Sequence, residues 1–277
     1  MTQDYKKIKN SLKILLYLLF LPAMVLILTS CSIIPGIGQF NPGDNWELEK
    51  TEHFDIYYRA DSYAEENLDD ISRVQEEAYQ YILEQLKVQF NDTISIYIYQ
   101  TPEDAGWDHV QGLAYCRQRI ALGVYSEEGK SIGVEGASAH EITHVITWNA
   151  IGKPGTTFLN EGIAVTMDGE WHAVSDPITN LHQWTKKFMD DNKLPTINEM
   201  VNNWDFFSGL ITYPVSGSFV SYLIDEYGIE KFKEMLVEAK KYNFNSKCVD
   251  IYNKELNELE QDWKVYVVQI TESLGKV

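Results

Sequence analysis

Two of the six histidines in this sequence stand four residues apart, in the stretch HEITH that runs from His140 to His144. On an α-helix, residues at this spacing project from the same face, one turn apart. Two imidazoles placed in this way can bind one tetrahedral metal ion at bond lengths of roughly 2.0–2.1 Å. Glu141 is displaced around the helix, which suits a general base acting on a water that the metal activates. The stretch therefore predicts a catalytic metal site, with Zn²⁺ as the metal.

A catalytic zinc ion needs a third protein ligand and an open fourth position. Glu161 lies seventeen residues after His144, in the stretch FLNEGIA. The chain between them is expected to finish one helix, turn at 152–155 and begin a second helix, so an antiparallel return would bring Glu161 beside the histidines. A solvated helix glutamate is the alternative, but an unpaired charge is costly among apolar residues, and the neighbours are Phe158, Leu159, Ile163 and Ala164. We expect Glu161 to be the third ligand.

The elements that must position these residues follow from hydrophobic periodicity. Runs rich in β-branched and aromatic residues predict strands at 53–59, 93–100 and 118–126. Apolar residues at steps of three and four predict a long amphipathic helix at 62–88. Further helices are predicted at 133–150, 156–171, 176–192, 196–203, 213–227, 229–241 and 255–272. Strands followed by helices indicate an α+β fold, in one domain that we place at 46–277.

The two motifs together resemble the gluzincins, zinc peptidases whose third ligand is a glutamate on a second helix. The resemblance extends toward the peptidase MA-like members of that group, and it covers nearly all of 46–270. It rests on the stretches WELEKTEHFDIYY, ISIYIYQ, TYPVSGSFVSYLIDEYGIEKFKEML and LEQDWKVYV. It implies a metal-dependent peptidase that acts on peptides or proteins. It also implies a zincin-like fold, with a strand-rich N-terminal lobe over a mostly helical C-terminal lobe and the active-site cleft between them.

Further site residues follow from the same resemblance. Tyr213 stands in a segment similar to the family's tyrosine-bearing helix start, which implies a donor to the oxyanion; the alternative is a packing tyrosine, since the chain has seventeen. Asn160 and Asp168 are candidates to orient a ligating histidine. The alternative for both residues is helix capping or solvent exposure, which we favour for Asp168.

Two other functions stay open as alternatives. One is an aminopeptidase on the same zinc site, although the G-x-M-E-N element of many gluzincin aminopeptidases is missing and SIGVEGASAHE offers only Glu135 in its place. The other is a binding lipoprotein that keeps the zincin fold, does not cut, and captures a peptide or a cell-wall ligand. The intact H-E-x-x-H motif with Glu161 argues against the second alternative.

Residues 1–30 are predicted to be a bacterial lipoprotein signal peptide. A basic segment precedes an apolar run of about fifteen residues, which is short for a membrane span of roughly 20. The stretch LTSC that follows resembles the lipobox, which implies cleavage before Cys31 and lipidation of its thiol. Two lipid attachments hold a protein on a membrane better than one chain does. We therefore expect a membrane-anchored, extracytoplasmic protein, with an uncleaved single-span anchor as the alternative.

The remaining composition bounds the partners and the cysteine chemistry. Residues 31–45 are rich in glycine and proline and are expected to form a lipidated tether. The formal net charge of the chain is −18, and residues 1–30 contribute +3, so the mature form would carry −21. Such a charge does not favour nucleic acid; it favours solubility and, more weakly, basic substrates. Cys116 and Cys248 are expected either to form a disulfide, which an exported location permits, or to remain as buried thiols.

Overall fold

The structure is a computed structural model that describes residues 40, 42–101, 104–105, 112–126, 139–171 and 178–274. Within these residues, one sheet contains β1 (Glu47–Lys50), β2 (Phe54–Tyr58), β3 (Ile94–Tyr99), β4 (Gly112–Tyr115) and β5 (Ile120–Val124). The strand order is β1-β2-β3-β5-β4. The three central strands run parallel, whereas β1 and β4 pair antiparallel at the two edges. The strand β4 is therefore an edge strand, joined to the sheet through β5 alone.

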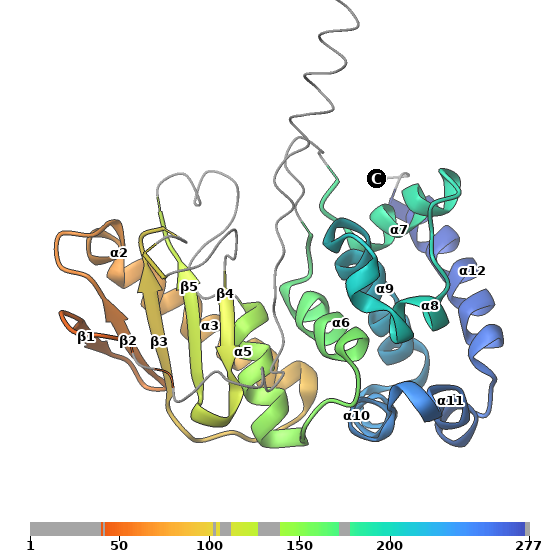
Figure 1. Ribbon diagram of the computed structural model, residues 1–277, viewed down its shortest axis with the longest axis horizontal. Helices are drawn as coiled ribbons and strands as arrows, with labels where there is room; N and C mark the ends of the chain where they lie inside the picture. The colour runs from red at the N-terminus through yellow and green to blue at the C-terminus, as the bar shows by residue number, and fades with distance from the viewer. Residues whose placement is uncertain are drawn as a thin grey trace, which may run out of the picture.

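The inner face of the sheet is covered by two helices, α3 (Leu68–Leu86) and α5 (Ala139–Ile146), as Figure 1 shows. Side chains alternate between the two faces of a strand, and on β3 the inner positions Ile94, Ile96 and Ile98 are buried in the main core. Tyr79 and Ile82 of α3 belong to the same core. The sheet and these helices thus fix the position of the helix that carries HEITH.

The remainder of the described chain is helical. Its α-helices are α6 (Thr157–Asp168), α7 (Leu181–Asp190), α8 (Ile197–Asn202), α9 (Gly209–Tyr227), α10 (Ile229–Glu238), α11 (Phe244–Tyr252) and α12 (Leu256–Leu274). In Figure 1, α6 lies between the sheet with its two helices and the group formed by α7 to α12. The predicted α+β class, with strands in the N-terminal part and helices after them, is confirmed.

Several boundaries differ from those predicted. The helix expected at 62–88 is two helices, α2 (Tyr63–Glu66) and α3, because the chain leaves helical geometry at Asn67. The strand β1 has the sequence ELEK and is exposed throughout, so it lacks the apolar alternation that identifies a strand. The strand β4 begins with a glycine and has four residues, and it was missed for a similar reason. The helix α11 was also missed.

The outer face of the sheet carries a second, smaller apolar cluster around Tyr99, Leu122 and Val124. Phe40 packs on it, with its ring centroid 4.9 Å from that of Tyr97. Trp46 packs there as well, 5.1 Å from the ring of Tyr99. Within the segment expected to be a tether, 31–45, Phe40 is therefore already packed on the sheet.

The expectations about the membrane and the cysteines fall only partly on residues that the structure describes. The signal peptide at 1–30 and Cys31 lie outside the described residues. Among the residues that are described, no helix combines the length and the apolar character needed to cross a bilayer. Cys248 is buried with a free thiol, so its pairing with Cys116 is not formed.

Candidate metal centre

The helix α5 carries the two histidines on one side and apolar side chains on the other. Ile142, Val145 and Ile146 are fully buried in the main core, which holds the helix against the sheet. His140 and His144 then lie on the opposite side, with ring centroids 4.8 Å apart and planes nearly perpendicular. Both are buried, with 6% and 1% of their surfaces exposed. The four-residue spacing therefore brings the imidazoles together, as the sequence predicts.

The chain reverses direction after α5 and returns as α6. A π-helical turn at Thr147–Ile151 ends the first helix, and Gly152 continues with φ 141°, a conformation that favours glycine. Gly155 then donates its N–H to the carbonyl oxygen of Leu236 at 2.7 Å, which ties the connection to α10. Thr156 caps the next helix by accepting a hydrogen bond from the N–H of Leu159. This return places α6 alongside α5.

The glycine at position 162, which is unfavourable in a helix, is explained by close packing of α6 on α9. A Cβ atom there would lie 2.6 Å from Cγ2 of Val220 and 2.9 Å from the carbonyl oxygen of Ser216. Only a residue without a side chain permits this approach. The neighbouring Glu161 is fully buried as a result of the packing around α6.

The carboxylate of Glu161 reaches both histidines. Its Oε2 lies 3.3 Å from Nε2 of His140 and 3.4 Å from Nε2 of His144. Ligand atoms bound to one tetrahedral zinc at roughly 2.1 Å are separated by about 3.4 Å. One ligand atom from each residue, all within 4.8 Å of one another, can therefore hold a metal ion. These three side chains, predicted from the sequence as ligands, come together in the structure.

The charges at this centre are strongly coupled. Burial alone would raise the pKa of Glu161, but His144 and His140 lower it to about 2. Burial alone would lower the pKa of His140, but hydrogen bonds with Asp168 and Glu161 raise it well above its usual value. The centre thus holds an ionised carboxylate beside an imidazole that gains a proton readily. A dication can replace that proton, since metal ligands must be deprotonated.

Glu141 follows His140 on α5 but does not belong to the group of side chains that could hold the metal ion. It is 3% exposed, and burial raises the pKa of its carboxyl to about 7, against the opposing effect of the two histidines. Its Oε2 is buried and makes no hydrogen bond with any described residue. A carboxyl group whose pKa is close to neutral can both accept and release a proton at physiological pH. The role of Glu141 as the general base stays a prediction.

Two polar residues of α6 support the ligands. Asn160 donates a hydrogen bond from Nδ2 to Oε1 of Glu161 at 3.1 Å. The sequence predicts a contact with a histidine, whereas the observed contact is with the carboxylate of Glu161. Asp168 has its Oδ2 3.4 Å from Nδ1 of His140. Asp168 is solvent-exposed, as the favoured alternative has it, and its carboxylate contacts His140 as well. Such contacts fix the orientation of a ligating imidazole.

Tyr213 borders the same centre. Its ring centroid lies 6.1 Å from that of His140, and the side chain is buried. Trp171 stacks on it at 5.0 Å with nearly parallel planes, and Trp204 meets it edge-on at 5.5 Å. The contact with His140 brings Tyr213 to the centre, and its oxyanion role stays a prediction. The two tryptophan contacts also make it a packing residue.

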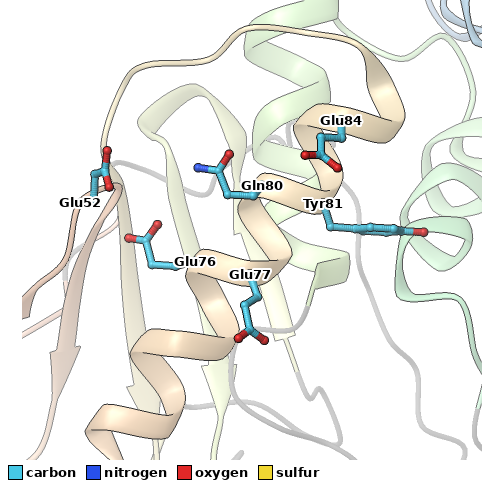
Figure 2. A pocket seen from close by; sticks show the side chains of 6 residues that line it. All are labelled: Glu52, Glu76, Glu77, Gln80, Tyr81 and Glu84. Atoms are coloured by element: carbon cyan, nitrogen blue, oxygen red, sulfur yellow. The ribbon is translucent and has the colours of Figure 1, made fainter.

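A separate acidic hollow is lined by residues of α3 and of the turn before β2. Figure 2 shows its lining side chains, Glu52, Glu76, Glu77, Gln80, Tyr81 and Glu84. Glu76 is engaged by His53, whose Nδ1 lies 2.6 Å from its Oε2, and Glu77 accepts hydrogen bonds from Arg73. Neither histidine of HEITH contributes to this hollow. Among the described residues, the metal-binding geometry lies at α5 and α6.

The chain was compared with known proteins. A family model described as the peptidase MA superfamily matches residues 75–269, a range that includes the three candidate ligands, Glu141 and Tyr213. No curated protein matches the chain significantly. Because the family model covers more than half of the 277 residues, the chain belongs to the peptidase MA superfamily.

Proposed function

We propose that this protein is a zinc-dependent peptidase of the gluzincin type, which hydrolyses bonds in peptide or protein substrates. The observation that carries the proposal is the grouping of His140, His144 and Glu161, whose ligand atoms all lie within 4.8 Å of one another, with Glu141 buried beside them. Three protein ligands with an open fourth position are typical of catalytic zinc, whereas structural zinc is closed by a fourth. The described residues offer no fourth ligand in this group.

Each residue around the centre has its own role in the proposed hydrolysis. Zinc, when bound, supplies a Lewis acid and lowers the pKa of water to about 7. Glu141 takes the proton of the attacking water and delivers it to the leaving amine, which its raised pKa favours. Tyr213 is the candidate donor to the developing oxyanion. Asn160 holds the carboxylate of Glu161, and Asp168 orients His140.

The edge strand β4 supports a peptide as the substrate. Among the residues that the structure describes, it pairs with β5 alone, and its first residue lies against Glu141. An extended peptide can add to a free strand edge through main-chain hydrogen bonds. A chain bound in this way would pass the proposed base.

The experiment that tests the function is cleavage of an unbiased peptide library by the purified protein, before and after removal of zinc by a chelator. We expect cleavage of both N-blocked and unblocked peptides, loss of cleavage on chelation and recovery when zinc is added back. Cleavage of unblocked peptides alone would favour the aminopeptidase alternative. No cleavage by the zinc-loaded protein would contradict the proposal and favour a binding lipoprotein.

We further propose that the protein is anchored to the membrane by lipid on Cys31 and faces away from the cytoplasm. The proposal rests on the basic and apolar segments of 1–30 and on the lipobox-like LTSC. Packing of Phe40 on the sheet would leave a short connection between the lipid and the folded body. Cys31 lies outside the described residues, so this proposal rests on the sequence.

Replacement of the lipidated residue tests the anchor. Cys31→Ala is expected to release the protein from the membrane or to block its maturation, because lipid is the strong attachment that remains after cleavage. Membrane fractionation and mass spectrometry of the mature N-terminus measure both outcomes, and Cys248→Ala serves as the matched control. A Cys31→Ala protein that starts at Met1 and stays in the membrane would instead indicate a single-span anchor.

A further inference from the structure

The first residue of β4, Gly112, lies directly against the carboxylate of Glu141. A Cβ atom built on this glycine would lie 2.6 Å from Oε1, 2.9 Å from Cγ and 3.1 Å from Cδ of Glu141. A Cβ contact shorter than 3.0 Å forces one of the two partners to shift, because the glutamate side chain occupies the space that any other residue at position 112 would need. Glycine within a strand often marks such a close approach.

Space, and not backbone conformation, is the reason for glycine at this position. The glycines with positive φ in the described chain are Gly43, Gly152, Gly169 and Gly228. Gly112 is not among them, and it lies in regular antiparallel pairing with Gly123 of β5. An alanine could therefore adopt the same backbone, and only its contact with Glu141 would exclude it.

We propose that Gly112 is a positioning residue for Glu141, an inference that rests on the proposed peptidase function. The two carboxylate oxygens have different surroundings: Oε1 is the atom nearest to where a Cβ of residue 112 would lie, whereas Oε2 is buried without a hydrogen bond to any described residue. Contact with the strand on one side thus leaves the other oxygen to receive the proton. The glycine acts through Glu141 and does not itself meet the reacting atoms.

A side chain at position 112 is expected to displace Glu141, the proposed base, and to leave the strand β4 in place. The strand β4 is held by its ladder with β5 from Gly112 to Tyr115, and the inward-facing Ala114 is buried in the core. The torsions of the Glu141 side chain can change at less cost than the paired strand can shift, so the glutamate is the partner that moves. A displacement of about 1 Å of a catalytic group can reduce turnover by about 10²-fold.

The first arm of the test is kinetic. Gly112→Ala is expected to lower kcat by about 10- to 100-fold, with KM and zinc content close to those of the wild type. Ile120→Ala, in β5, is the control for a general disturbance of the sheet, because its side chain packs in the cluster on the outer face of the sheet. We expect this control to keep its kcat. A Gly112→Ala enzyme as active as the wild type would overturn the proposed role.

The second arm needs no activity. Gly112→Ala is expected to lower the Tm of the protein, and Glu141→Ala should remove most of that loss because it deletes the atoms in the way. An equal loss of Tm with and without the Glu141 side chain would show that the glycine serves the fold alone, and would overturn the inference. A wild type that cleaves nothing would overturn the proposed function and this role with it, whereas an active wild type beside an equally active Gly112→Ala would overturn this role alone.

Discussion

Glu141→Gln is expected to lower peptide turnover by roughly 10²–10⁴-fold, the range typical of a lost general base, and to leave zinc content and Tm nearly unchanged. Glutamine keeps the shape of the side chain but cannot accept the proton. The residue is buried beside the ligands, and its pKa of about 7 suits transfer in both directions. The measurement is kcat on a peptide found by the library screen, with zinc content determined on the same preparation.

A matched control separates the loss of the base from the loss of a buried charge. Glu260 is 4% exposed and accepts a hydrogen bond from the N–H of Ile197, away from the proposed centre. Glu260→Gln is expected to lower the Tm of the protein and to leave kcat unchanged. Cleavage by Glu141→Gln at the wild-type rate would contradict the proposed mechanism, even with zinc fully bound.

Glu161→Ala is expected to weaken zinc binding by more than about 100-fold and to abolish cleavage. The expectation follows from the position of its Oε2, 3.3 and 3.4 Å from the two imidazole nitrogens. Outer partners of metal ligands are worth roughly 10–100-fold in metal affinity, and a direct ligand is worth more. Competition with a chromogenic zinc chelator measures the affinity.

Asp168→Asn provides the graded comparison for Glu161→Ala. Asp168 contacts His140 and does not reach the ligand position itself, so its replacement is expected to cost about 10–100-fold in zinc affinity. Asp190→Asn, at the last position of α7 as Asp168 is of α6, is expected to have no effect. Wild-type zinc affinity in Glu161→Ala would show that the third ligand is wrongly assigned.

The sequence predicts the parts of the site that lie at short, regular spacings. His140 and His144 follow helical geometry, and Glu161 follows from a short turn between two helices, so these contacts can be inferred without coordinates. The alternation of Ile94, Ile96 and Ile98 likewise identifies a central strand. In each case one periodicity determines which side chains share a face.

The residues that sequence reasoning missed are brought in by tertiary packing. Gly112 meets Glu141 across a segment of the chain that no local pattern spans, because the strand that carries it is short and begins with glycine. Asp168 meets His140 only because α6 lies antiparallel beside α5. Phe40 packs on aromatic side chains of β3 and β4, although its own neighbours read as a tether. Such contacts depend on how elements are placed, which propensity does not specify.

Anomalous diffraction at the zinc absorption edge, from crystals of the purified protein, tests the proposed metal most directly. We expect one strong peak within roughly 2.0–2.2 Å of Nε2 of His140, Nε2 of His144 and a carboxylate oxygen of Glu161, with no fourth protein ligand. The carboxylate of Glu141 should lie beside the ion without binding it. A zinc-supplemented crystal with no peak at this position, or with a fourth protein ligand closing the site, would contradict the proposed peptidase.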